Sequence, residues 1–464
     1  MKNGFYILLS LLLIFPHTFI SETIIFAWHI HRHGARSPLS GIRNHADIYK
    51  EPWLEKQELT NVGKRMLYLL GVNVRKRYIE KYKLLSETYS PQEILIRSTD
   101  VNRTIESVES LLQGLYPHGS GPSINKNVAE NKNISYPPNK LYNDKFEDLI
   151  EQYELNKENN YYALPFKMNI LPIHLFYRPA HEFELYSTDI CPGHTEIYKA
   201  QEKREEIKAF GEKLTSTFPN VFETLEGTTN KTILYGYSAL YKYADTYIAD
   251  DRDKRELKIL KEQFHFNESD FKTLEKYSKE YLDMDYFDTN YPKDHPEIST
   301  MAFSYTFHSI INWMENAKKG KESNNKNYIK YVIYSAHDSS IGALENFMEN
   351  NFNTKAEYSE FAESRFFELY KDDNGVYKVR YLKGDSLEPK VDMEFNEFKK
   401  KINADTWSDE KVGEYCHFIK ESKKETSIFF IVMICLAGVN AVFLIILIIL
   451  FAKKNKYKKV VEKA

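Results

Sequence analysis

The chain has 464 residues, of which 42% are apolar and 28% are charged, the ordinary balance of a globular protein. This length exceeds what one ordinary domain needs and allows a large buried core. The formal net charge of −3 gives no indication of nucleic-acid binding, and three cysteines are too few for a disulfide-dense scaffold.

The first 21 residues have the features of a secretory signal peptide. Lys2 precedes an apolar run from Phe5 to Phe15, and the segment ends at Ser21. A membrane anchor is the alternative, but the apolar run is short for a span of the bilayer. We therefore expect residues 1–21 to be a signal peptide.

An apolar, partly β-branched segment from Ile24 to Ile30 predicts a buried strand. Gly34 and Pro38 interrupt this pattern, so residues 32–37 should form a loop at the C-terminal end of the strand. In open α/β sheets, ligands bind at that edge. The loop is therefore the first candidate site of the chain.

This loop carries Arg32, His33 and Arg36, a combination suited to a phosphoryl group. Arginine binds phosphate oxygens in pairs, and an imidazole can attack phosphorus as a nucleophile. Two alternatives are a basic turn without a function and a metal site built on His31 and His33. The metal site is disfavoured because no cluster of cysteines or carboxylates completes it.

Residues 59–63 predict the start of a helix with Thr60 as its N-cap. A short apolar strand at residues 93–96 is then followed by a helix with one apolar face. Arg97 lies at the end of this strand beside the helix N-terminus, which is a favourable place for an anion. Arg103 lies inside the helix and is interpreted as structural.

The region 119–320 differs from the rest, because long polar helical stretches alternate in it with Asn-rich loops. We expect it to form an inserted, mainly helical cap. Its three N-glycosylation sequons begin at Asn133, Asn230 and Asn267. Such triplets arise by chance in an Asn-rich chain, so they support exposure to a secretory lumen only weakly.

A second buried strand is predicted at residues 331–336, and it delivers His337 and Asp338 at its end. A His-Asp pair alone is a weak signal, because such pairs are common on protein surfaces. Residues 366–382 alternate in a pattern typical of a β-hairpin, with its turn at residues 373–375.

Residues 428–452 contain no charged side chain and predict a single transmembrane helix. At about 1.5 Å per residue they would extend about 37 Å, against a hydrocarbon core of about 30 Å. A buried core helix is the alternative, which the all-round apolar character disfavours. The lysines that follow favour a type I topology, with residues 453–464 as a short cytoplasmic tail.

The segment Arg32–Pro38 resembles the RHGxRxP motif of the histidine acid phosphatases. Further landmarks follow in the order of that family: residues 59–63, Arg97–Thr104, Cys191, His337–Asp338 and Cys416. The resemblance implies an α/β fold with a doubly wound sheet and helices on both faces, as in phosphoglycerate mutases. The core would consist of residues 22–118 and 321–420, on either side of the cap.

In this resemblance His33 is the nucleophile and Asp338 is the proton donor, and the phosphate is bound by Arg32, Arg36, Arg97 and His337. The arginines should keep His33 neutral in mild acid, and a bound phosphate should help Asp338 to hold its proton. No metal or other cofactor is implied. The family's cysteine pairing implies a disulfide between Cys191 and Cys416.

The resemblance thus predicts a metal-independent acid phosphomonoesterase that works through a phosphohistidine intermediate on a small-molecule or peptide substrate. With the predicted signal peptide and span, its catalytic domain would face a lysosomal or endosomal lumen or the cell exterior. The alternatives are a phytase-like inositol-phosphate phosphatase and a catalytically inactive receptor or adhesion ectodomain. The prediction includes membrane anchoring and no nucleic-acid partner, and it leaves a homodimer open.

Overall fold

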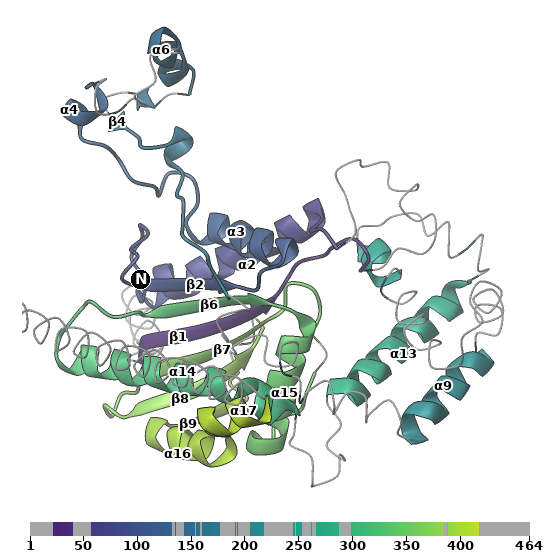
Figure 1. Cartoon of the computed structure of the whole chain (residues 1–464). Helices are drawn as coiled ribbons and strands as arrows, with labels where there is room; N and C mark the ends of the chain where they lie inside the picture. The colour runs from purple at the N-terminus through teal and green to yellow at the C-terminus, as the bar shows by residue number, and fades with distance from the viewer. Residues whose placement is uncertain are drawn as a thin grey trace, which may run out of the picture.

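A computed structural model describes the chain at residues 22–39, 57–131, 135, 143–153, 155–157, 160–176, 191, 193, 205–217, 245, 247–252, 261, 266–286, 298–357, 359–384, 386 and 388–416. Its centre is a mixed seven-stranded sheet in the order β5-β2-β6-β1-β7-β8-β9 (Figure 1). The strands are β1 (Thr23–Arg32), β2 (Ile94–Ser98), β5 (His174–Leu175), β6 (Tyr331–Ala336), β7 (Ser364–Lys371), β8 (Tyr377–Lys383) and β9 (Val391–Glu394).

The sheet is parallel from β5 to β1 and antiparallel from β1 to β9. The β-hairpin predicted at residues 366–382 is confirmed as β7 and β8, and Gly375 supplies the positive φ of +81° that its turn requires. The strands predicted at residues 93–96 and 331–336 are confirmed as β2 and β6.

Helices cover both faces of the sheet (Figure 1). One face packs against α2 (Asn61–Arg75), the π-helical turn η2 (Lys76–Lys81) and α3 (Asn102–Leu115). The other face packs against α14 (Ile298–Glu322), α15 (Asp338–Phe352) and α16 (Phe395–Asp405). The expected α/β sheet with helices on both faces is therefore present, with three antiparallel strands added at one edge.

Strand β1 lies in the middle of the sheet and is buried along nearly its whole length. Because side chains alternate along a strand, Trp28 and Ile30 face the α14 layer, whereas Ala27 packs in the α2 and α3 layer. Burial on both faces explains why the segment is almost continuously apolar.

The region 119–320 contributes elements to three different places. Strand β5 pairs with β2 in the central sheet, and α14 packs on the face of that sheet. A small lobe that projects from the sheet contains α4 (Lys126–Ala129), α6 (Asn143–Gln152), β3 (Asn156–Lys157) and β4 (Asn160–Tyr161) (Figure 1). Helices α9 (Glu205–Thr217) and α13 (Glu268–Tyr286) lie beyond the edge at which β1 ends.

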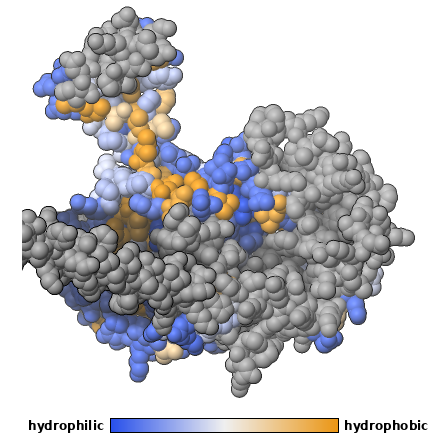
Figure 2. Space-filling model, in the orientation of Figure 1, coloured by the Kyte–Doolittle hydropathy of each residue, from blue (hydrophilic) through white to orange (hydrophobic). Residues whose placement is uncertain are grey.

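Apolar residues are exposed over α2 and α3 and along the segment that leads to the lobe (Figure 2). Leu69, Phe166 and Ile170 are among the exposed large side chains. Phe166 lies in a short 3₁₀ turn, η3 (Pro165–Lys167).

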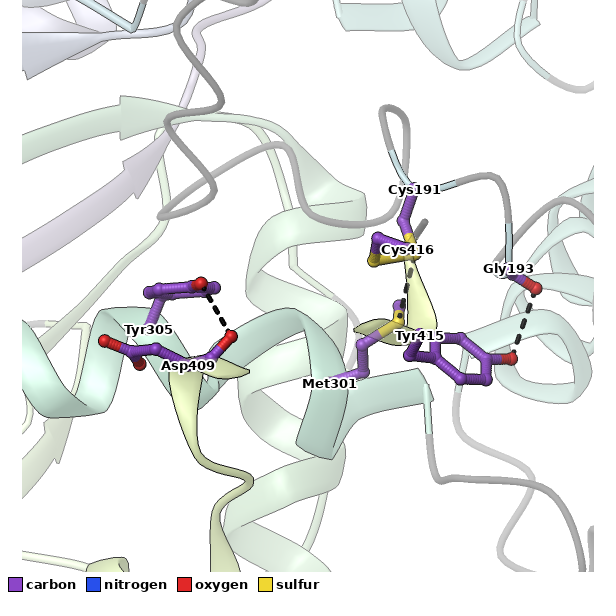
Figure 3. Close-up of a disulfide and its surroundings, with 7 residues drawn as sticks. All are labelled: Cys191, Gly193, Met301, Tyr305, Asp409, Tyr415 and Cys416. Atoms are coloured by element: carbon purple, nitrogen blue, oxygen red, sulfur yellow. Dashed lines mark hydrogen bonds between the residues drawn. A yellow bond between two sulfur atoms is a disulfide. The ribbon is translucent and has the colours of Figure 1, made fainter. Parts of the chain in front are cut away.

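A disulfide joins Cys191 to Cys416, across 225 residues of sequence, as the resemblance implied (Figure 3). Cys416 directly follows α17 (Asp409–Tyr415), and the hydroxyl of Tyr415 donates a hydrogen bond of 3.2 Å to the carbonyl oxygen of Gly193. The hydroxyl of Tyr305 on α14 donates to the carbonyl oxygen of Asp409. The disulfide therefore fastens the inserted region to the C-terminal end of the described chain.

Several sequence predictions lie outside the described residues, namely the signal peptide, the segments 428–452 and 453–464, and the sequons at Asn133 and Asn230. Across the part of the chain that the structure describes, no helix has the length and apolar character to cross a membrane. Asn267 is exposed and directly precedes α13, and its Oδ1 accepts the backbone N–H of Ser269.

Candidate active site

The two predicted motifs meet at one edge of the sheet. Strands β1 and β6 are parallel neighbours, with Arg32 opposite Ala336, so both strands end together. The backbone N–H of His33 donates to the carbonyl oxygen of Ala336, at 3.0 Å. His33 and His337, one residue beyond each strand, have ring centroids 5.6 Å apart. This edge is where ligands bind in open α/β sheets.

The loop after β1 rests on the first turn of α2 at van der Waals distance. A Cβ atom at Gly34 would lie 2.5 Å from the carbonyl oxygen of Gly63, and one at Gly63 would lie 2.1 Å from that of Ala35. Thr60 caps α2 as predicted, accepting the N–H of Gly63, and its own N–H binds the Ala35 carbonyl oxygen. Only glycine permits this approach, so both glycines help to fix the loop.

His33 is buried, with its side chain held in one orientation. Its Nδ1 lies 2.9 Å from the carbonyl oxygen of Gly34, an atom that can only accept, so Nδ1 carries the proton. In the neutral ring, Nε2 then has the free electron pair. Burial lowers the pKa of His33 well below its ordinary value, and the charges of Arg32 and Arg36 lower it further. The imidazole therefore stays neutral in acid, with Nε2 unprotonated, as a nucleophile requires.

Arg32 connects the two motifs directly. Its Nη2 lies 2.7 Å from Oδ2 of Asp338, and its Nη1 donates to the carbonyl oxygen of Ser359, at 2.5 Å. The guanidinium also lies over the ring of Phe361, 4.3 Å from the ring centroid. Burial alone would raise the pKa of Asp338, but the charges of Arg32 and Arg36 outweigh it and hold the pKa below its ordinary value.

His337 is the N-cap residue of α15, and both of its ring nitrogens have partners. Arg103 donates from Nη2 to Nδ1 at 3.3 Å, so the neutral ring carries its proton on Nε2, which lies 3.0 Å from Oγ1 of Thr99. Burial, and then the charge of Arg103, lower the pKa of His337 to about 3. The ring is therefore neutral above that pH.

The structure brings Arg103, and not Arg97, to this group of residues. Arg103 lies in the first turn of α3, and its charge contributes to the lowered pKa of both His33 and His337. The guanidinium carbon Cζ of Arg97 instead lies 3.8 Å from the ring centroid of Phe176, which belongs to the hydrophobic cluster that α14 covers. The interpretation of Arg103 as structural does not fit this position.

The alternation of strand β2 is the signal that distinguishes the two arginines. Ile94 and Ile96 face the α2 and α3 layer, so Leu95 and Arg97 face the opposite layer. The helix after β2 starts at the edge where the site lies, and this places its first turn, with Arg103, beside His337.

Two parts of the site carried no sequence signal. The first is Asp245, from the inserted region, whose carboxylate binds the guanidinium of Arg36 with Nη2–Oδ1 2.7 Å and Nη1–Oδ2 3.3 Å. The second is the turn before β7, which supplies Ser359 and Phe361 to Arg32. In this turn the N–H of Ala362 donates to the carbonyl oxygen of His33, at 3.1 Å.

The two residues of the alternative metal site, His31 and His33, have different ring neighbours, His29 and His337. His31 lies on the opposite side of β1 from Ile30, beside His29, with their ring centroids 5.5 Å apart in the interior. Among the described residues, His, Cys, Asp and Glu side chains form no group of three or more that could hold a metal ion.

Comparison with known proteins gives the family. The sequence model of the histidine phosphatase superfamily (branch 2) matches residues 23–383. Lysosomal acid phosphatase of Xenopus laevis is 27% identical over 388 residues, which are 79% of this chain and 71% of that protein. Lysophosphatidic acid phosphatase type 6 of Mus musculus is 39% identical over 80 residues, which are 17% of this chain and 19% of that protein.

The solved structure of Hafnia alvei phytase in complex with tartrate has a similar fold. It superimposes with a TM-score of 0.51 at 12% identity, covering 85% of this chain and 98% of that chain. Since the superfamily match spans most of the sheet and both motifs, the chain belongs to branch 2 of the histidine phosphatase superfamily.

Proposed function

We propose that this chain is an acid phosphomonoesterase that forms a phosphohistidine at His33. One observation carries the proposal: a buried neutral imidazole with its Nε2 unprotonated lies among arginines, at the same sheet edge as a carboxylate. Arginine guanidinium groups supply the positive charge that phosphoryl transfer requires, and the fixed ring supplies the nucleophile.

The first half of the reaction uses both motifs. The phosphate oxygens bind to Arg32, Arg36 and Arg103, and to the Nε2–H of His337 in place of its contact with Thr99, which places phosphorus in line with Nε2 of His33. A bond forms between Nε2 and phosphorus, while the bond to the leaving oxygen breaks with its electron pair. Asp338 gives a proton to that oxygen, so the product leaves as a neutral alcohol.

The second half regenerates the site. Water attacks the phosphohistidine, Asp338 accepts a proton from this water, and the phosphorus–nitrogen bond breaks with its electron pair returning to Nε2. Orthophosphate is then released. In this scheme Arg103 takes the role that the motif resemblance gave to Arg97, because its guanidinium binds His337.

Hydrolysis of p-nitrophenyl phosphate by the full-length chain in detergent tests this function, scanned from acid to neutral pH with a chelator present. We expect activity that is highest in acid and is abolished by His33→Ala. His118→Ala, at an exposed histidine away from the sheet edge, is the matched control and should keep full activity. A folded wild-type protein without activity would refute the proposal and favour the receptor alternative.

We also propose that the catalytic domain faces an oxidising lumen or the cell exterior, on a single C-terminal span at residues 428–452. The Cys191–Cys416 disulfide supports this side of the membrane, because such bonds persist in oxidising compartments. Protease digestion of intact vesicles should spare the catalytic domain and remove the epitope of a tag placed after residue 464. Digestion of the domain in sealed, lumen-protected vesicles would contradict this topology.

A further inference from the structure

Asp245, in the segment 245–252 of the inserted region, binds Arg36 of the catalytic loop. Its carboxylate is buried and accepts hydrogen bonds from both η nitrogens of Arg36, and its Oδ2 also accepts the backbone N–H of Leu39, at 2.7 Å. It therefore contacts the loop at two points that lie three residues apart.

These contacts fix the direction in which Arg36 presents its donors. Nη1 donates to Asp245 and also to the carbonyl oxygen of Ser37, at 3.1 Å, and Nη2 donates to Asp245. The carboxylate thus binds the edge of the guanidinium that Nη1 and Nη2 form. The other edge, formed by Nε and Nη2, is one that Arg uses for paired contacts with a phosphate.

The same segment makes a second ion pair with the core, at Arg252. Its Nη2 lies 2.8 Å from Oε2 of Glu360, in the turn that supplies Ser359 to Arg32. The two pairs differ in their surroundings, because both Arg36 and Asp245 are buried, whereas both Arg252 and Glu360 are about two-fifths exposed. An exposed pair contributes little, so the buried pair is the one able to hold a side chain in place.

We propose that Asp245 is a positioning residue for catalysis, which orients Arg36 for the substrate phosphate from the inserted region. This inference rests on the proposed phosphatase function. It implies that the region whose sequence carries the fewest landmarks nevertheless sets the affinity of the site for phosphate. A charge-assisted contact of this kind, once lost, leaves Arg36 without a fixed direction.

The test compares Asp245→Asn with Arg252→Gln in the full-length chain, since each removes one ion pair between segment 245–252 and the core. We measure kcat and KM for p-nitrophenyl phosphate and the competitive inhibition constant of orthophosphate. Asp245→Asn should raise both KM and the inhibition constant about tenfold, with a smaller change in kcat. Arg252→Gln should leave all three values within about twofold.

Asp245→Glu keeps the charge but moves the carboxylate by one methylene, and should raise the inhibition constant about threefold. If Asp245→Asn does not fold, Asp245→Glu tests the positioning role in its place. An unchanged inhibition constant in the folded variants would overturn the proposal. Tighter orthophosphate binding in Asp245→Asn would overturn it too, because Asp245 would then compete with phosphate for Arg36.

If the proposed phosphatase function itself is wrong, the measurements differ from those expected when only the positioning role of Asp245 is wrong. In that case the wild-type protein hydrolyses no phosphomonoester, yet orthophosphate binding can still be compared through the thermal shift it produces in each variant. An active wild type with an unaffected Asp245→Asn would refute only the positioning role.

Discussion

The carboxylate of Asp338 lies 2.7 Å from a guanidinium nitrogen of Arg32, so the proposed proton donor is paired with a proposed phosphate-binding residue. The pairing helps to hold the pKa of Asp338 below its ordinary value, and the group is ionised in the resting site. A phosphate that binds Arg32 would weaken this pairing and add negative charge, and both effects raise the pKa. Substrate binding thus favours the protonated form of Asp338, which can then act as the general acid.

Asp338→Asn should therefore affect substrates according to their leaving groups. For an alkyl phosphate, whose leaving oxygen needs a proton, kcat should fall by about 10²–10⁴-fold. For p-nitrophenyl phosphate the fall should be much smaller, because nitrophenolate leaves without a proton. Steady-state kinetics with the two substrates checks this, and Asp373→Asn, in the exposed turn of the β7–β8 hairpin, is the control. Equal losses on both substrates would argue against a proton-donor role.

The third arginine is tested by a matched pair of substitutions. Arg103→Gln should lower kcat/KM about 10²-fold, because this side chain binds His337 and contributes to the field at His33. Arg97→Gln should leave kcat/KM within about twofold and lower stability by about 1 kcal/mol, because its guanidinium stacks on Phe176. The reverse ranking in kcat/KM would restore the role that the motif resemblance gave to Arg97.

The two catalytic motifs could be found from the sequence because each directly follows a buried strand. Strands β1 and β6 are marked by their apolar runs, and parallel neighbours end at the same edge, so His33 and His337 had to meet if the strands paired. The motif resemblance assigns the role of the third phosphate-binding arginine to Arg97 from its position along the chain. The side-chain direction, set by the alternation of β2, instead favours Arg103.

The contacts of Asp245 and Ser359 could not be predicted in the same way. Asp245 is 209 residues from Arg36, in a region without motifs, and a carboxylate there is indistinguishable from the many others in a polar helical segment. Ser359 contributes only its carbonyl oxygen, which every residue has. Such partners are specified by the path of the folded chain.

Stability in acid should depend on two buried histidines that the reaction does not use. Burial lowers the pKa of His31 from 6.5 to about 4, and it lowers the pKa of His29 as well. Between about pH 4 and pH 6.5, His31 therefore binds more protons in the unfolded chain than in the folded protein. The stabilisation is therefore complete above about pH 6.5 and is lost as the pH falls toward 4. For His31 alone the loss amounts to about 3 kcal/mol.

His31→Gln removes this titration, so the thermal midpoint should fall less between about pH 7 and about pH 4.5 than in the wild type. The difference between the two pH values is the readout, because it does not depend on any loss of packing. His118→Gln, at an exposed site, should leave the difference unchanged. An undiminished difference in His31→Gln would mean that His31 does not contribute to acid sensitivity.

The turn before β7 holds a non-glycine residue in the left-handed region, since Ala362 has φ = +62° while its N–H binds the carbonyl oxygen of His33. Such a conformation costs about 1–2 kcal/mol for a residue with a Cβ atom. Ala362→Gly should therefore raise the free energy of unfolding, measured by urea denaturation, by up to about 1 kcal/mol, because the strain relieved exceeds the entropy added to the unfolded chain. Activity should be kept, because the backbone hydrogen bond to His33 remains.

Ala362→Val should have the opposite effect, because a β-branched side chain disfavours positive φ strongly. The turn would then shift, and with it Ser359 and Phe361, which contact Arg32. We expect a lower thermal midpoint and a higher KM, measured with p-nitrophenyl phosphate. Val376→Ala, at an exposed position in the β7–β8 hairpin, controls for a general loss of stability near β7. If Ala362→Val kept the wild-type KM, the turn would not be needed to hold Arg32.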